Sequence, residues 1–481
     1  MTSFIISAKK KSPFLVLKSA ANSMLLKINM SFLVFLISTS ITHAQVNDSV
    51  TIRNIFNQAL NKGEAYKNLE VLCRDYGKRL AGSPGAAGAV NYTQRLMQQY
   101  GFDSVWLQPC MVPHWVRGEK ETAYYLTSKS EKKELTICAL GNSIGTGNKG
   151  IIAPVIEVKS FAQLDSFGRK NIEGKIVFFS HAMDQTKIRT FEAYGEGVQF
   201  RWGGAAKAVK YGAVGVMVRS VATSLDDFPH TGAMHYEDTL PKIPACAVST
   251  LDAEELSAQI KRDPATKIYF RQRCEMLPDE PSFNVIGELR GTENPKEFIT
   301  VGGHLDAWET GDGAHDDGAG VMQSIDVLYL FKSLGIRPKH TIRAVMFMNE
   351  ENGSRGGIKY ADEAKAKNEK HLFAIESDAG GFDPRGFSFS GDKPAIEKIK
   401  IWQPFFLPYG IYDFENGGSG ADIGHLEGNC KVLSGLMPDP QRYFDYHHAA
   451  SDTFDKVNRR ELELSAAAMA ALIYLVDKYG L

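Results

Sequence analysis

The sequence lacks several features that would directly assign the protein to a structural or functional class. Its six cysteines include no pair at metal-ligand spacing, which argues against the cysteine-rich sites that hold structural zinc. Its charges nearly cancel, 55 Lys and Arg against 56 Asp and Glu, so the basic surplus of a nucleic-acid-binding protein is absent. The apolar run at residues 32–41 is too short to span a bilayer. No internal repeat or low-complexity tract is visible, which leaves the composition of an ordinary globular protein.

Residues 1–44 have the order of a secretory signal: a basic stretch, the apolar run, and then small residues ending in Ala44. We expect cleavage after Ala44. The protein would then be exported, periplasmic or secreted, with no stable membrane association once the signal is removed. The alternatives are a membrane anchor or a disordered tail. Because the basic stretch is long, Met24 or Met30 could also be the true start. In an oxidising compartment the cysteines could form disulfides, but their spacing does not indicate which of them pair.

Imidazole and carboxylate side chains gather in a glycine-rich stretch after the apolar run at residues 298–301. They are His304, Asp306, Asp316 and Asp317. Glycines let the backbone turn sharply and bring such side chains together. Imidazole and carboxylate are the ligand types of zinc sites, so this stretch indicates a metal centre.

Three later segments repeat the pattern, with acidic or imidazole groups where an apolar run ends. They contribute Glu350 and Glu351, then Asp378, and finally His447, His448 and Asp452. Any one segment is more often a solvated surface feature. In open α/β sheets, however, ligands bind at the edge where the carboxyl ends of the strands meet. The four segments together therefore favour a metal site at such an edge.

These segments resemble the co-catalytic zinc peptidase family that includes bacterial leucyl aminopeptidase, glutamate carboxypeptidase and carboxypeptidase Q. In that family a His-x-Asp is followed by Asp-Asp-Gly, then Glu-Glu, a lone Asp, and a His four residues before an Asp. The chain is most similar to the carboxypeptidase Q branch, through residues 113–118, residues 228–232 and the doubled histidine at 447–448. The resemblance covers nearly the whole chain after the signal.

The resemblance implies two zinc ions per chain, bridged by Asp316. His304 and Asp378 would complete one metal site, and Glu351 and His448 the other. It also implies a cis peptide bond between residues 316 and 317.

The resemblance further implies catalytic roles for three other residues. Glu350 would be the general base, and Asp306 would orient His304, as a ligating imidazole requires. Several relatives have a tyrosine directly before the last ligand histidine, where it contacts the transition state. Here that position is His447, and Tyr446 lies one step further back. Either of the two could face the substrate carbonyl.

The pattern of helices and strands predicts an α/β fold. Strands alternate with helices such as residues 320–334 and 460–479, which favours a mainly parallel α/β sandwich. The phosphorylase/hydrolase-like topology comes from the resemblance, as does an inserted β-rich protease-associated domain at residues 119–275. The catalytic domain would then be formed by residues 45–118 and 276–481. Because both ends of the insert join the catalytic domain, we expect it to form a wall of the cleft.

The predicted function is hydrolysis of dipeptides, or of N-terminal residues of short peptides, by metal-activated water. The alternative is a carboxypeptidase on the same site. It would need a cation for the substrate carboxylate, and Arg355 and Arg385 are near the motifs. A non-catalytic peptide-binding relative or a single-zinc transferase on this fold would lack some of the ligands, and all five are present. The expected partners are a short peptide and, from the resemblance, a second copy in a homodimer, with no nucleic acid.

Overall fold

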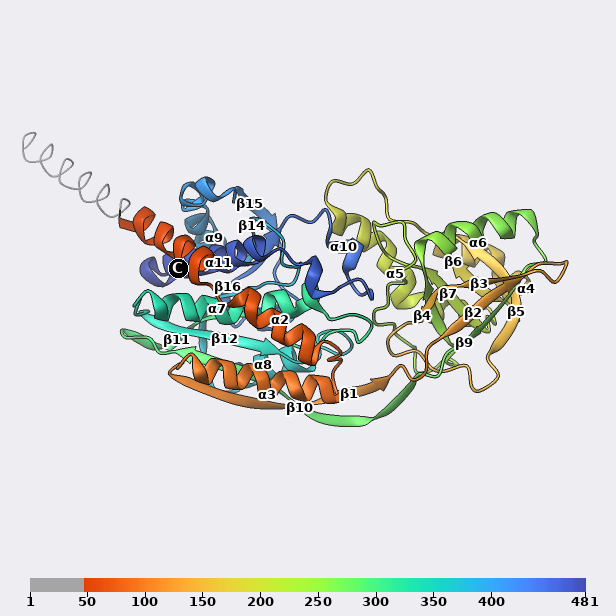
Figure 1. Ribbon diagram of the computed structural model, residues 1–481, viewed down its shortest axis with the longest axis horizontal. Helices are drawn as coiled ribbons and strands as arrows, with labels where there is room; N and C mark the ends of the chain where they lie inside the picture. The colour runs from red at the N-terminus through yellow and green to blue at the C-terminus, as the bar shows by residue number, and fades with distance from the viewer. Residues whose placement is uncertain (1–46) are drawn as a thin grey trace, which may run out of the picture. The chain divides into compact units, whose positions relative to one another are not determined.

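Two eight-stranded mixed sheets organise the chain (Figure 1). The structure is a computed structural model that describes residues 47–481, so the predicted signal at residues 1–44 lies outside the described residues. The first sheet has the strand order β1 (Ser104–Val116), β10 (Glu275–Leu289), β12 (His340–Phe347), β11 (Asn294–His304), β13 (Lys370–Glu376), β16 (Cys430–Pro438), β14 (Pro384–Gly391) and β15 (Asp413–Gly417). The second has the order β3 (Lys132–Leu135), β2 (Thr122–Leu126), β9 (Lys267–Arg271), β5 (Ile151–Val158), β6 (Ile176–Phe179), β7 (Gly215–Arg219), β8 (Ala245–Val248) and β4 (Ile137–Ala139).

The first sheet is parallel at its centre and mixed towards its edges. β12, β11, β13 and β16 run parallel to one another, whereas β10 is antiparallel to β12 and β14 is antiparallel to β16. The expectation of a mainly parallel sheet therefore holds for the centre, and the sheet as a whole is mixed. Every residue of β12 is buried, as expected for a strand that is covered on both faces.

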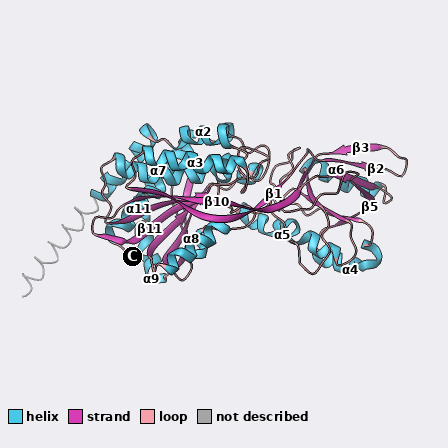
Figure 2. Ribbon diagram, turned by 90° about the horizontal axis from the view of Figure 1, so that it is seen from below, coloured by secondary structure: helices cyan, strands magenta, loops and turns pink. Residues whose placement is uncertain are grey.

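Helices cover both faces of the first sheet (Figure 2). On one face lie α3 (Pro84–Gln99), α7 (Ala319–Ser333) and α11 (Arg459–Tyr479), with α2 (Ala65–Tyr76) packed on α7; on the other lie α8 (Arg355–Ala366) and α9 (Lys393–Lys400). Local chemistry sets the start of α3, since the Ser83 hydroxyl accepts a hydrogen bond from the Ala86 amide at 3.1 Å and proline occupies the first turn. A buried run of alanines at residues 466–468 lets α11 pack closely against its neighbouring elements.

The second sheet carries three helices, α4 (Phe161–Ile172), α5 (Thr190–Val209) and α6 (Thr250–Arg262). The expected β-rich segment is thus an α/β unit, and we call residues 122–271 the second-sheet unit. No helix within residues 47–481 combines the length and the apolar character needed to cross a membrane.

A two-stranded ribbon connects the second-sheet unit to the first sheet. β1 leads into the unit and β10 leads out of it, and the two strands pair from Ser104 opposite Glu288 to Val116 opposite Glu275. The register shifts between Val112 and His114.

Candidate metal centre

Neighbouring parallel strands deliver the ligand candidates to one edge of the first sheet. His304 is the last residue of β11, Glu350 and Glu351 follow the adjacent β12, and Asp378 follows β13 on the other side. Asp316 lies in the turn η1 (Ala314–Gly318), which leads directly into α7. This is the meeting of strand ends that the sequence pattern predicts.

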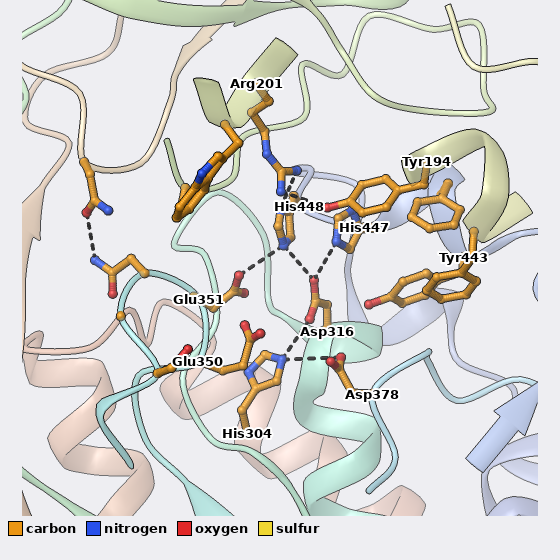
Figure 3. Close-up of a pocket in the computed structure, with 18 residues that line it drawn as sticks. Tyr194, Arg201, His304, Asp316, Glu350, Glu351, Asp378, Tyr443, His447 and His448 are labelled. Carbon is orange, nitrogen blue, oxygen red and sulfur yellow. Dashed lines mark hydrogen bonds and ion pairs between the residues drawn. The ribbon is translucent and has the colours of Figure 1, made fainter. Parts of the chain in front are cut away.

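Asp316 lies between two groups of ligand candidates (Figure 3). One carboxylate oxygen, Oδ1, is 3.2 Å from His304 Nε2, which in turn lies 3.5 Å from Asp378 Oδ1. The other oxygen, Oδ2, is 3.2 Å from His448 Nε2, which lies 3.0 Å from Glu351 Oε2. Each oxygen of Asp316 thus faces its own imidazole–carboxylate pair. The peptide bond between residues 316 and 317 is cis, as predicted.

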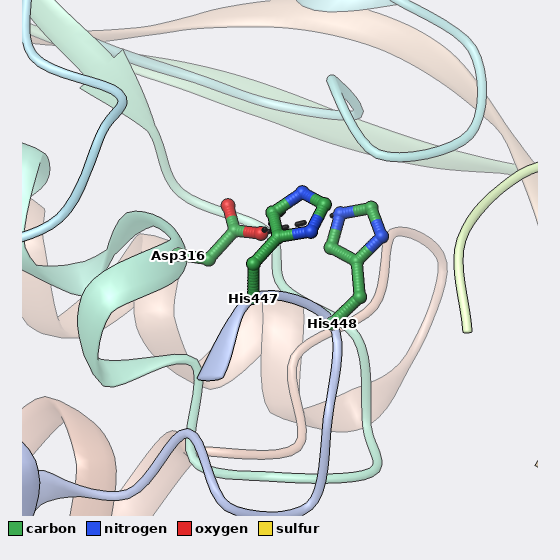
Figure 4. Close-up of side chains that lie close together, drawn as sticks. All are labelled: Asp316, His447 and His448. Carbon is green, nitrogen blue, oxygen red and sulfur yellow. Dashed lines mark ion pairs between the residues drawn. The ribbon is translucent and has the colours of Figure 1, made fainter. Parts of the chain in front are cut away.

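His447 lies beside His448 and is a further candidate on that side (Figure 4). Its Nε2 is 3.6 Å from Asp316 Oδ2, and the two imidazole rings stack with their centroids 3.6 Å apart. The family resemblance implies that Glu351 is the ligand on this side, and its Oε2 lies 3.0 Å from His448 Nε2. His447 lines the cavity, whereas Tyr446 stacks on His315. The geometry therefore favours His447 over Tyr446 as the group that faces a substrate.

Three further aspartates support these side chains through backbone amides. Asp306 accepts hydrogen bonds on Oδ1 from the amides of residues 349 and 350, at 2.7 and 3.1 Å, and thereby fixes the loop that carries Glu350. His304 Nδ1 lies 3.0 Å from the carbonyl oxygen of Asp306 and 4.0 Å from its carboxylate, so the carbonyl is the contact that orients this imidazole. Asp317 accepts from the amides of residues 304 and 320. Asp452 accepts from the amides of residues 315 and 316.

The buried carboxylates create a strong demand for positive charge. Burial, together with the carboxylates of Asp378 and Glu351, raises the pKa of Glu350 well above its usual value. Burial opposes protonation of His448, yet the carboxylates of Glu351 and Asp316 raise its pKa to about 9. Cations placed among these groups would satisfy the same demand.

The residues present suit zinc. Imidazole and carboxylate are preferred zinc ligands, and Asp316 Oδ2 is buried without a hydrogen-bond partner among the described residues. The contact of His304 Nδ1 with a carbonyl leaves its Nε2 directed at Asp316, which is the orientation a ligating imidazole needs. His304, Asp316 and Asp378 would hold one ion, and Asp316, Glu351 and His448 the other.

A cavity of ≈450 Å³ opens over these residues. Seven of the eight predicted site residues line it, namely His304, Asp316, Glu350, Glu351, Asp378, His447 and His448; Asp306 is fully buried behind them. Arg201, Tyr194 and Trp202 from α5 of the second-sheet unit also line the cavity, which confirms the expectation of a wall contributed by this part of the chain. These three residues could not be predicted from the sequence, because nothing around them forms a motif.

Neither of the two arginines considered from the sequence reaches the cavity. Arg355 lines a second cavity, which shares Asn142 with this one. Arg385 is paired with Asp383 and Asp439, at 2.8 and 3.2 Å. Arg201 is the one arginine or lysine among the described residues that line the cavity.

Known proteins are similar to this chain in sequence and in fold. A family model described as Peptidase family M28 matches residues 284–473. Carboxypeptidase Q of Bos taurus is 34% identical over 434 residues, which cover 90% of this chain and 89% of the relative. Carboxypeptidase Q of Homo sapiens is 34% identical over 422 residues, which cover 88% and 86%.

Solved structures agree with this similarity. A peptidase M28 precursor from Shewanella amazonensis SB2B has a TM-score of 0.85 at 32% identity, covering 90% of this chain and 97% of that one. BSAP, a zinc aminopeptidase from Bacillus subtilis, has a TM-score of 0.62 at 17% identity, covering 86% and 94%, and shows the likeness of fold alone. The names of the curated relatives favour the carboxypeptidase alternative over the aminopeptidase expectation. The ligand groups and these relatives together show that the chain belongs to peptidase family M28, as a metallo-exopeptidase similar to carboxypeptidase Q.

Proposed function

We propose that this metallo-exopeptidase hydrolyses dipeptides and the C-terminal bond of other short peptides, with Arg201 binding the substrate carboxylate. The position of Arg201 carries the proposal. Its side chain is buried, lines the cavity above the metal-ligand candidates, and has no ion pair with a carboxylate in the described part of the chain. Its Nη2 donates to the Tyr194 hydroxyl at 2.8 Å, while its Nε is buried without a partner. A buried guanidinium without a carboxylate partner suits a carboxylate ligand.

The removal of N-terminal residues is the second candidate. Its support is the carboxylate-rich wall of the cavity, where Glu350 and Asp378 would favour a free amine. A dipeptide offers both ends at once, an amine for the carboxylates and a carboxylate for Arg201. The two candidates therefore differ in which end of a longer peptide is recognised.

In the proposed reaction Glu350 moves the proton. Two zinc ions in a site of this kind lower the pKa of water and polarise the peptide carbonyl. Glu350 would take the proton from the attacking water and pass it to the leaving amine. The amide of Glu350 is held by Asp306 at 3.1 Å, so the base is carried on a fixed loop. His447 and Tyr443 also line the cavity and are placed to donate to the developing oxyanion.

We also propose two zinc ions per chain, export after removal of residues 1–44, a protease-associated character for the second-sheet unit, and a homodimer. The opposing faces of Asp316 support the number of ions, and the order of the first 44 residues supports export. Elemental analysis that finds one ion at saturation would remove the two-metal proposal. Amino-terminal sequencing of the exported protein should begin at Gln45.

Blocked dipeptides test which end is recognised. Amidation of the C-terminus removes one charge-assisted interaction, worth roughly 1.5–3 kcal/mol, so kcat/KM should fall by about 10–150-fold. Acetylation of the N-terminus should have a smaller effect. The variant Arg201→Gln should erase the preference for the free carboxylate, and Arg201→Lys should keep part of it. The opposite ranking of the two blocked substrates would establish the aminopeptidase instead.

A further inference from the structure

We propose that the second-sheet unit is part of the metal centre, because His230 and Thr231 position the ligand candidate His448. This inference rests on the proposed function only in that His448 binds a metal. It assigns a role in metal affinity to two residues of the second-sheet unit that are not among those lining the cavity.

The segment His230–Gly232 forms hydrogen bonds with the backbone on both sides of His448. The Thr231 amide donates to the His448 carbonyl at 2.9 Å. His230 Nδ1 lies 2.6 Å from the carbonyl oxygen of His447, and since a carbonyl can only accept, this nitrogen carries the proton. These two hydrogen bonds fix the peptide units before and after His448.

The same segment contacts the imidazole itself. His448 Nδ1 lies 3.2 Å from the carbonyl oxygen of Thr231 and 3.3 Å from Nη1 of Arg201, while its Nε2 faces Asp316 and Glu351. When Nε2 binds a metal, the ring proton is on Nδ1, and of these two neighbours only the carbonyl can accept it. A hydrogen bond from Nδ1 to a carbonyl fixes both the tautomer and the ring orientation of a ligating histidine. For His304 this contact comes from the first sheet, through Asp306. For His448 it comes from the second-sheet unit.

These contacts are important because His448 has an unfavourable backbone conformation. Its φ is +64°, in the left-handed region that residues other than glycine rarely adopt. Such a conformation persists only where surrounding contacts hold it. Residues 443–448 have many of those contacts in the second-sheet unit, including Thr223 Oγ1 donating to Asp445 at 2.7 Å and the Tyr194 ring stacked on Phe444.

The segment His230–Gly232 is itself bound to the second sheet by hydrogen bonds. The amide of His230 donates to Ser220 Oγ at 2.9 Å, and that hydroxyl donates to the carbonyl of Val248 in β8 at 2.7 Å. Thr231 Oγ1 donates to the carbonyl of Ala139 in β4 at 2.8 Å. A chain of short hydrogen bonds therefore connects His448 to the second sheet and fixes its orientation.

Gly232 shows how closely the two parts fit. A Cβ at this position would lie 2.5 Å from Arg201 Cζ and 2.6 Å from His448 Nδ1, and the φ of Gly232 is +128°. A side chain here would force the guanidinium of Arg201 and the imidazole of His448 to shift. This position thus admits glycine alone in the present arrangement.

The test compares the zinc affinities of two matched variants of the full chain. His230→Leu removes the donor to the carbonyl of residue 447, whereas His230→Asn, which has the same branching as Leu, keeps a donor nitrogen close to the Nδ1 position. Stepwise competition with a chelator measures the two zinc dissociation constants, and the ion held by His448 is the one that Glu351→Gln also weakens. Tyr211→Phe, which removes a surface hydrogen bond to Asp165, is the control.

We expect His230→Leu to weaken that one ion by roughly 10–100-fold, the usual effect of losing a partner of a ligand. The other ion should change by less than about threefold, and His230→Asn should restore most of the affinity. Unchanged affinities in folded His230→Leu, or equal loss of both ions, would overturn the inference. If that variant does not fold, Gly232→Ala decides: a wild-type affinity there also overturns it. A wild-type protein that binds no zinc would instead refute the proposed function.

Discussion

Replacing Glu350 by glutamine separates catalysis from metal binding. Glutamine has the same shape but cannot accept the proton of the attacking water. General-base catalysis contributes about 10²–10⁴-fold, which is about 3–5.5 kcal/mol of transition-state stabilisation, so kcat on a dipeptide should fall by that factor. The loop should not move, because Asp306 binds the amide of residue 350 and this contact does not involve the replaced side chain.

Both metals should remain in Glu350→Gln. The carboxylates of Asp378 and Glu351 contribute to the raised pKa of Glu350, so they repel its charge, and its loss relieves that repulsion. The thermal midpoint of the loaded protein should accordingly stay the same or rise. Elemental analysis, kcat on a dipeptide and a melting curve on one preparation measure all three quantities.

The adjacent residue provides the matched control. Glu351 Oε2 lies 3.0 Å from His448 Nε2, and Oε1 accepts from the Trp308 amide at 3.2 Å. Glu351→Gln should weaken one zinc by more than the roughly 10–100-fold expected for an outer partner, and activity should return at high zinc concentration. Activity of Glu350→Gln within tenfold of the wild type, or a loss of zinc from it, would refute the assignment of the base.

Three other predictions concern stability and thiol chemistry. Arg79 is fully buried and donates to three carbonyls of the loop before Asp316, those of Leu305, Asp312 and Gly313. Each hydrogen bond to a charged group contributes about 1.5–3 kcal/mol. Arg79→Met should therefore lower the free energy of unfolding, measured by urea titration, by at least about 3 kcal/mol. Burial raises the pKa of Glu463 from 4.5 to about 7, so the folded state binds this proton more tightly than the unfolded state and stability is lost as the pH rises between these values. Glu463→Gln should therefore stabilise the protein at pH 8 by up to about 3 kcal/mol and far less at pH 5; an equal effect at both values would contradict this. All six cysteines are free, so alkylation of the denatured protein without reductant should modify six thiols, as counted by mass spectrometry.

Strand ends could be predicted from the sequence because they combine two local signals. An apolar run marks each strand, and an acidic or imidazole group directly follows it, as for Asp378 after β13. Parallel strands then bring such groups together whatever their separation along the chain. This rule accounts for His304, for the glutamates at 350 and 351, and for Asp378. Asp316 and the histidines at 447 and 448 lie further along the loops, where the motif spacing of the family indicated them.

The parts that the sequence did not predict depend on tertiary contacts. α5 contains four glycines, at 195, 197, 203 and 204, and such a composition disfavours a helix. Packing overrides this propensity, since a Cβ at Gly204 would lie 2.9 Å from the Phe179 ring. The first half of β10 is exposed and lacks the alternation of a half-buried strand, so only its pairing with β1 identifies it.

The paired ribbon of β1 and β10 has a consequence for biosynthesis. Val116 and Glu275 are neighbours in the sheet, yet the whole second-sheet unit is translated between them. At roughly 5–20 residues per second, a ribosome needs on the order of ten seconds to supply the partner of β1. During that interval β1 has no strand to pair with, while the second-sheet unit gains all of its own strands. The order of synthesis therefore allows the second-sheet unit, whose residues contact His448, to fold first. The sheet that carries the other ligand candidates can form only afterwards.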